Sequence, residues 1–177
     1  MDVARKLESY TIEDIYSLSD GQRAELIDGQ IYYIAPPSWG HQVISRKLHQ
    51  AIANYIDSNN GKCEALAAPF AVFLNADDET YVEPDISVIC DLSKLDDKGC
   101  HGAPDWIIEI VSPSSKVRDY MTKLFRYRTA GVREYWIVDI EKQMVTVYGF
   151  EKNVVEQYSF GEDVPSGIYE GFLIKVQ

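Results

Sequence analysis

Long hydrophobic runs are absent from this sequence of 177 residues. No stretch of about 18 consecutive apolar residues occurs, so no transmembrane helix is expected. The N-terminus also lacks the positively charged region followed by an apolar stretch that is typical of a secretory signal. We therefore expect a cytoplasmic protein.

Cysteine is scarce, with only three residues. Cys63, Cys90 and Cys100 are an odd number and show no CxxC spacing, which argues against a disulfide framework and against a zinc knuckle. We expect all three to be free thiols.

Positive charge is also in short supply, since 17 Lys and Arg residues face 28 Asp and Glu residues, for a net charge of −11. This balance disfavours broad, non-specific binding of nucleic acid, because such binding depends on neutralising phosphates. A basic cluster within residues 116–133 offers either a local basic face or a solvated helix face with ion pairs. Its members are Lys116, Arg118, Lys123, Arg126, Arg128 and Arg133.

The overall composition is that of a globular protein. Apolar residues make up 46% and charged residues 25% of the chain, as in soluble domains that bury a core. Internal repeats and low-complexity linkers are lacking. The length predicts a single domain over residues 1–177.

Two predicted strands each carry one carboxylate among apolar neighbours. Asp85 lies within residues 82–89 and Glu109 within residues 105–111. Because side chains alternate across a strand, Asp85 shares a face with Ser87, and Glu109 shares one with Ile107 and Val111. If the two faces coincide, the carboxylates converge. Such a pair predicts a site for Mg²⁺ or Mn²⁺, which binds carboxylate, water and phosphate oxygens.

The order of motifs around these acids resembles a known family. Pro84-Asp85 precedes Glu109-Ile110-Val111-Ser112-Pro113-Ser114, and Asp119 and Lys123 then precede Gly131-Val132-Arg133-Glu134-Tyr135-Trp136-Ile137-Val138-Asp139. With Glu25-Leu26-Ile27-Asp28-Gly29 upstream, the pattern is similar to the Uma-type restriction endonucleases, a branch of the PD-(D/E)XK nuclease superfamily. The resemblance implies an α/β, restriction-endonuclease-like fold: a mixed central β-sheet flanked by helices, with extra β-hairpins. It also implies metal-dependent hydrolysis of DNA phosphodiester bonds, with Asp85 and Glu109 as metal ligands.

One signature position departs from the superfamily pattern. Two residues after the acid, where the superfamily has lysine, this chain has Val111. In the Uma-type pattern the lysine lies on the following helix, so Lys123 is the candidate catalytic residue. A surface pair between Asp119 and Lys123 at four-residue spacing is the alternative.

Several auxiliary residues surround this proposed centre. Glu25 lies in a predicted hairpin over residues 23–34, turning at Asp28-Gly29. In the resembling family an acid at this place assists the metal, and an exposed strand carboxylate is the alternative. His41 lies in the first turn of a predicted helix over residues 38–57, where it lines a cleft, contacts phosphate or carries a proton, or else is a hydrogen-bonded core histidine. Ser112 and Ser114 precede the next helix and could bind phosphate or simply cap it.

The remaining elements complete the predicted fold. We expect a short helix from Thr11, strands over 63–68 and 69–74, a polar turn over 75–79, and a loop over 93–104. A helix then runs to about Ala130, with its apolar residues buried. A buried strand follows over 133–140, then a hairpin over 143–160, a loop over 161–167 and a last strand over 168–176. The apolar residues of that helix are Val117, Met121, Leu124 and Phe125.

Two rival functions remain open at this point. A nuclease-like fold that no longer cuts could serve as a binding or assembly module, and the aromatic content would suit a homodimer interface. Hydrolysis of a small phosphate ester would suit the acidic surface better than a long polyanion does.

Overall fold

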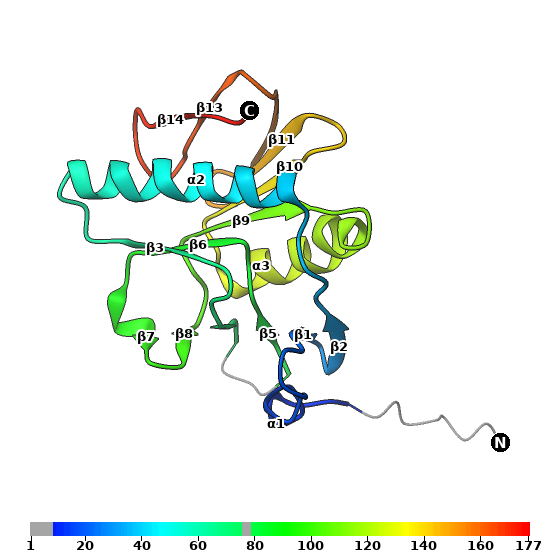
Figure 1. Ribbon diagram of the computed structural model, residues 1–177. Helices are drawn as coiled ribbons and strands as arrows, with labels where there is room; N and C mark the ends of the chain where they lie inside the picture. Colours follow the sequence, from blue (N-terminus) through cyan, green and yellow to red (C-terminus); the bar gives the residue numbers. More distant parts are fainter. Residues whose placement is uncertain (1–8, 76–78) are drawn as a thin grey trace.

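A computed structural model describes residues 9–75 and 79–177 (Figure 1). The polar turn predicted over 75–79 therefore lies partly outside the described residues. The helical segments are α1 (Ile12–Tyr16), α2 (Trp39–Ser58), the 3₁₀ turn η1 (Leu92–Lys94), the π-helix η2 (Arg118–Lys123) and α3 (Leu124–Ala130). Within the described residues, no helix is long and apolar enough to cross a membrane.

A mixed six-stranded sheet forms the centre of the molecule. Two of its strands, β9 (Trp106–Val111) and β10 (Glu134–Asp139), are parallel and are connected through η2 and α3. Trp136 lies beside Ile108 in this pair. The predicted order of a strand over 105–111, a helix and a buried strand over 133–140 is thus confirmed. In spatial order the strands are β12 (Val154–Ser159), β11 (Met144–Gly149), β10 (Glu134–Asp139), β9 (Trp106–Val111), β6 (Ile86–Ile89) and β3 (Glu64–Ala67).

A second six-stranded sheet and a short pair of strands complete the fold. The second sheet has the order β2 (Gln30–Tyr33), β1 (Ala24–Ile27), β5 (Tyr81–Val82), β4 (Val72–Phe73), β8 (Gly99–His101) and β7 (Leu95–Asp96). The short pair is β13 (Asp163–Pro165) and β14 (Leu173–Lys175). The predicted mixed α/β class is confirmed, with the strands shared between two large sheets.

The two faces of the central sheet pack against different layers. On one face, α2 contributes Ile44, Leu48, Ile52 and Ile56 to a core that includes Trp106 and Trp136 from the sheet. Figure 1 shows α2 lying across that face, with β13 and β14 beyond it. On the other face, α3 and the second sheet enclose a separate core. The inner strands β6, β9 and β10 are therefore buried on both sides, whereas the edge strand β12 is mostly exposed.

Local sequence signals explain several elements. The side chain of Ser38 caps α2 by accepting a hydrogen bond from the backbone N–H of His41 at 3.2 Å. The β1–β2 hairpin turns through Asp28 and Gly29, whose φ angles of 53° and 70° suit this dipeptide. Both predicted elements are confirmed.

The predictions of one strand and two loops need correction. The strand expected over residues 82–89 is broken, because β5 ends at Val82 and β6 begins at Ile86. Pro84 lacks an N–H for a sheet ladder, and Asp85 therefore lies in the link rather than in a strand. Strands also occur in both predicted loops: the loop expected over 93–104 contains β7 and β8, which pair with each other, and the loop expected over 161–167 contains β13, which pairs with β14.

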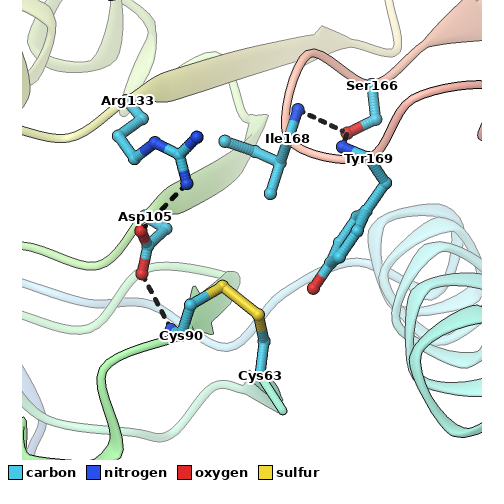
Figure 2. The surroundings of a disulfide bond; sticks show 7 residues. All are labelled: Cys63, Cys90, Asp105, Arg133, Ser166, Ile168 and Tyr169. Carbon is cyan, nitrogen blue, oxygen red and sulfur yellow. Dashed lines mark hydrogen bonds and ion pairs between the residues drawn. A yellow bond between two sulfur atoms is a disulfide. The ribbon is translucent and has the colours of Figure 1, made fainter. Parts of the chain in front are cut away.

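The prediction of three free thiols is wrong for two of them. Cys63 and Cys90 form a disulfide, while Cys100 is free and buried (Figure 2). The antiparallel β3–β6 register pairs Glu64 with Ile89. Continued by one residue, it sets Cys63, just before β3, opposite Cys90, just after β6. Figure 2 also shows Asp105 accepting a hydrogen bond from the backbone N–H of Cys90, at 2.8 Å. An odd number of cysteines carries no information about such a register.

Candidate active site

The β6–β9 ladder brings the two predicted acids together. This antiparallel ladder pairs Ser87 with Ile107 and Ile86 with Ile108. Carried one residue further, the register sets Asp85 opposite Glu109. The Asp85 carboxylate confirms this proximity, because its Oδ2 accepts a hydrogen bond of 2.7 Å from the backbone N–H of Ile110. The face that carries Asp85 and the face that carries Glu109 therefore coincide, which was the condition for the two carboxylates to converge.

Lys123 reaches the same place from the π-helix. Its Nζ lies 2.7 Å from Glu109 Oε1 and 2.8 Å from Glu25 Oε1. Asp119 Oδ1 is 3.7 Å from the same nitrogen, so the predicted surface pair does form, but inside the protein. Lys123 is 3% exposed and Glu109 is 5% exposed. One buried ammonium is therefore surrounded by three carboxylates.

Tyr127 adds a neutral donor to this cluster. Its hydroxyl donates to Glu109 Oε1 at 2.7 Å, and the residue is fully buried. The ring of Tyr127 packs edge-on against Tyr135, whose hydroxyl donates to the backbone carbonyl of Asp119 at 3.2 Å. Tyr127 thus connects α3 to β9, and Tyr135 connects β10 to η2.

The helix presents the opposite face from the one predicted. Asp119, Lys123 and Tyr127, spaced by four residues, point inward and are buried. Val117, Met121 and Phe125, also spaced by four, are 73%, 68% and 59% exposed, so the predicted buried arc is wrong for these three. Leu124 does pack against the core. The sheet offers carboxylates on this side, and a buried charge without a partner costs more than leaving apolar side chains in water.

Burial and mutual charge shift the pKa values of the cluster. Burial raises the pKa of the Glu109 carboxyl, against the opposing effect of the Lys123 ammonium. Burial also raises the pKa of Asp119. Burial alone would lower the pKa of Lys123, but the carboxylates of Glu109, Glu25 and Asp119 outweigh it and raise that pKa. Lys123 is therefore held as an ammonium.

His41 contacts Asp85 from the first turn of α2. Its Nε2 lies 3.2 Å from Asp85 Oδ2, and the His41 side chain is 13% exposed. Burial acts to lower the pKa of His41, but the hydrogen bond and charge of Asp85 outweigh it and raise that pKa. The His41 imidazole therefore contacts Asp85, the predicted metal ligand, and does not lie in an apolar core.

Glu25 joins the second sheet to the centre. It is 2% exposed in β1, and its Oε1 accepts from Lys123 and from the backbone N–H of Glu83 at 3.1 Å. Its Oε2 lies 3.6 Å from Arg118 Nε, and the Arg118 guanidinium stacks over the Tyr32 ring at 5.0 Å. The exposed-carboxylate alternative for Glu25 is therefore wrong.

A cavity of about 630 Å³ opens onto these groups. Ser112 and Ser114 line it, and their hydroxyls lie 3.1 Å apart. Ser112 also exchanges hydrogen bonds with Ser115, so these serines shape the turn before the helix while facing the cavity. The predicted site residues that line the cavity are Glu25, His41, Asp85, Glu109, Ser112, Ser114 and Lys123.

The predicted basic face is largely neutralised by partners. Lys116 pairs with Asp139 at 3.2 Å, and Arg126 Nε donates to Asp28 Oδ2 at 2.8 Å. Arg133 pairs with both Asp105 and Glu151. Arg118 faces Glu25 as described, and Arg128 donates to Asn153 at 2.7 Å. A solvated face with ion pairs describes this region better than a free basic surface.

The donor chemistry of the site fits a hard divalent cation. Among the described residues, the side-chain hydrogen bonds of Asp85 use Oδ2 and those of Glu109 use Oε1, which leaves one oxygen on each carboxylate. No three His, Cys, Asp or Glu side chains in the described part of the chain form a complete ligand cluster. Two carboxylates plus water and substrate oxygens are the arrangement typical of magnesium.

Asp119, Tyr127 and Arg118 are the site residues that the sequence reasoning missed. Asp119 and Tyr127 stand at four residues on either side of Lys123, so placing Lys123 in the site should have placed both on the same helix face. Arg118 carried no comparable signal, because its approach to Glu25 depends on the packing of β1 against η2.

Comparisons with known proteins identify a family for this chain. A family model described as Uma2, putative restriction endonuclease, matches residues 8–176. The uncharacterized protein slr1290 of Synechocystis sp. (strain ATCC 27184 / PCC 6803 / Kazusa) is 27% identical over 128 residues, which is 72% of this chain and 66% of that protein. The chain thus spans just under two thirds of the length of that relative.

A solved structure shares the fold. The crystal structure of a putative nuclease of DUF820 from Anabaena variabilis ATCC 29413 superposes with a TM-score of 0.72. The match covers 89% of each chain at 21% sequence identity. At this identity the likeness shows the fold alone.

Proposed function

Because the chain belongs to the Uma2 family of putative restriction endonucleases, we propose that it is a metal-dependent endonuclease that hydrolyses DNA phosphodiester bonds. One observation carries the proposal: the buried Lys123 ammonium contacts Glu109 and Glu25 at the base of a cavity that Asp85 also lines. Paired acids with an adjacent amine are the groups that phosphodiester hydrolysis needs.

Asp85 and Glu109 would hold the cation, Mg²⁺ or Mn²⁺. When bound, such an ion polarises a phosphoryl oxygen and lowers the pKa of the attacking water. The backbone N–H of Ile110 and the imidazole of His41 fix Asp85 Oδ2. Lys123 and Tyr127 fix Glu109 Oε1. Each carboxylate is thereby held by hydrogen bonds through one oxygen, and the other oxygen would be the one offered to the cation.

Lys123 has a separate role in the proposed reaction. Its ammonium orients the attacking hydroxide or offsets the negative charge that develops on the pentacovalent phosphorus. Glu25 contacts the same amine as Glu109 does and would assist through the metal or its water. The raised pKa of Lys123 keeps it charged for this purpose.

The cavity wall supplies groups for the phosphate. The hydroxyls of Ser112 and Ser114 would bind nonbridging phosphate oxygens. His41, next to Asp85, carries a proton to or from the leaving group. All three residues line the cavity.

Plasmid cleavage tests this function. Supercoiled plasmid and a short single strand are incubated with the wild type, Asp85→Ala, Glu109→Ala and Lys123→Ala, in Mg²⁺ or Mn²⁺ and in chelator. We expect cleavage by the wild type, and its loss in each variant and in chelator. Cleavage that persists in chelator or in the Asp85 and Glu109 variants would contradict the proposed centre.

A second candidate is an assembly module formed with another copy of the chain. It is favoured by the exposed apolar stripe of Val117, Met121 and Phe125 on the outer face of the helix, since exposed apolar patches mark interaction sites. Light scattering of the wild type and of Met121→Glu tests it. A dimer that dissociates in the variant supports the module, whereas a wild-type monomer contradicts it.

A further inference from the structure

Two exposed aromatic side chains stand at the two ends of a chain segment that lines the cavity. Tyr33, the last residue of β2, is 62% exposed and lines the cavity. Trp39, the first residue of α2, is 84% exposed. Every residue of the intervening run 34–38 also lines the cavity. Tyr33 is thus part of the cavity lining, and Trp39 directly follows the last lining residue of this run, Ser38.

The exposure of Trp39 has no structural explanation in the fold. The other two tryptophans, Trp106 and Trp136, are fully buried and pack against each other with ring centroids 4.9 Å apart. The cap of α2 is made by Ser38 and needs no aromatic residue after it. A tryptophan in water gains nothing for folding, but its flat face suits contact with a ligand.

The charge of the protein indicates what kind of contact a nucleic acid would need. The net charge is −11, and the basic residues near the cavity face acidic or amide partners. Phosphate neutralisation, which normally supplies much of the affinity, is weak on such a surface. Stacking of bases on aromatic rings supplies affinity that does not depend on net charge.

We propose that Tyr33 and Trp39 form a base-stacking platform at the cavity rim and that the substrate class is single-stranded DNA. In a duplex the faces of the bases are already covered by their neighbours, so only unpaired bases can stack on the two rings. The inference rests on the proposed nuclease function and adds strandedness to it. The strand would lie with bases on the rim and one phosphate over Asp85 and Glu109.

Binding in chelator tests the platform apart from cleavage. Three labelled probes are used: a short single strand of mixed sequence, the same sequence as a duplex, and an abasic strand with the same number of phosphates. Fluorescence anisotropy reports affinity. Tryptophan emission reports stacking, and because Trp106 and Trp136 are buried, quenching by the probe would arise at Trp39.

We expect the wild type to bind the single strand most tightly, with quenched emission. Trp39→Ala should lower that affinity by about 5- to 150-fold, the range for one stacked base, and Tyr33→Ala should lower it further. Trp39→Phe should retain most of the affinity and lose the quenching. Affinity should fall only shallowly with salt, since few phosphates are neutralised.

Tyr16→Ala is the matched control. Tyr16 is 55% exposed at the end of α1, and neither it nor its chain neighbours Ile15 and Ser17 line the cavity, so its removal should leave affinity unchanged. Circular dichroism checks that each variant is folded. Equal affinity of Trp39→Ala and wild type for the single strand, or equal affinity of the wild type for the abasic strand, would overturn the platform.

The result is separable from the fate of the proposed function. If the wild type cleaves DNA in Mg²⁺ but Trp39→Ala binds the single strand as the wild type does, the platform fails and the nuclease stands. If base-dependent binding and quenching occur without any cleavage, the platform stands and the nuclease fails. Preference for the duplex in the binding assay would overturn the platform together with the strandedness, since paired bases offer no free face to the rings, and would leave the nuclease standing.

Discussion

The two faces of strand β9 are built on opposite principles. Trp106, Ile108 and Ile110 point toward α2 into a core of apolar side chains. On the other side, Glu109 lies among Lys123 and Tyr127. Both side chains are buried, since Ile108 is 0% and Glu109 is 5% exposed, but a cavity opens onto Glu109 alone of the two. The apolar face stabilises the fold. The face with Glu109 holds buried charged groups, whose desolvation costs free energy.

A second buried carboxylate makes this contrast sharper. Glu134 is 3% exposed and begins β10, on the side of the sheet where Trp136 lies. It accepts from Trp136 Nε1 and from the backbone N–H of Gly167, each at 2.6 Å. Its hydrogen-bond partners are thus neutral donors that tie the C-terminal segment to the sheet. Glu109, by contrast, faces a cation and an open cavity. Burial of a carboxylate is therefore no mark of a site unless charged groups and space accompany it.

The largest expected effect comes from Lys123→Met compared with Ile108→Ala. Removing the ammonium leaves buried carboxylates without their cation, which costs about 3–5 kcal/mol of unfolding free energy. Ile108→Ala, on the other face, costs about 2–5 kcal/mol by leaving a cavity. Cleavage should fall at least about 100-fold in Lys123→Met and persist in folded Ile108→Ala.

Urea unfolding and cleavage rates measured under conditions where both variants are folded separate the two faces. If Ile108→Ala lost cleavage as completely as Lys123→Met, the division of labour between the faces would be wrong.

A smaller, pH-dependent effect is expected at Glu134. Burial raises the pKa of Glu134 to about 7, above its ordinary value of about 4.3 in an unfolded chain. The folded protein thus binds the proton more tightly, and the stability from this group is full below the unfolded pKa and lost as pH rises through about 7. The free energy of unfolding of the wild type should fall relative to Glu134→Gln over this window, by up to about 4 kcal/mol.

Denaturant unfolding of both proteins at a series of pH values measures this difference. A constant difference across the window, or one that grows in favour of the wild type as pH rises, contradicts the assignment.

The smallest expected effect concerns Tyr127→Phe. This change removes one hydrogen bond to Glu109 Oε1 while Lys123 still contacts that atom. The free energy of unfolding should fall by about 1–2 kcal/mol. We also expect a lower kcat with little change in KM, because the Glu109 carboxylate loses part of its orientation. Tyr135→Phe is the control, since its hydroxyl binds a backbone carbonyl instead. Steady-state kinetics that shift equally in both variants would show a merely structural role for Tyr127.

Much of the fold could be predicted because local signals dictate it. The Asp28-Gly29 turn, the Ser38 cap and the apolar run at Tyr135–Val138 each specify an element with little help from distant residues. Strand alternation predicted the convergence of Asp85 and Glu109 only on the condition that their two faces coincide, and the β6–β9 register meets that condition. These predictions depend on the backbone period, which the sequence displays directly.

The parts that failed depend on distant partners. The helix was expected to bury Val117, Met121 and Phe125, and the structure exposes them, because Glu25 and Glu109 on other elements attract Lys123 inward. The Cys63–Cys90 disulfide depends on the β3–β6 register. Neither can be read from spacing within one segment. The break at Pro84 was the exception, since that proline was a local signal against one continuous strand.

Calorimetric titration of Mn²⁺ tests most directly whether the charged face of β9 holds a shared cation. The wild type, Asp85→Asn, Glu109→Gln and Glu134→Gln are titrated in the same buffer, with Glu134 as the buried carboxylate of the opposite face. We expect binding heat for the wild type and Glu134→Gln, and its loss in Asp85→Asn and in Glu109→Gln. Undiminished binding in Asp85→Asn or Glu109→Gln would contradict a cation shared by these two carboxylates.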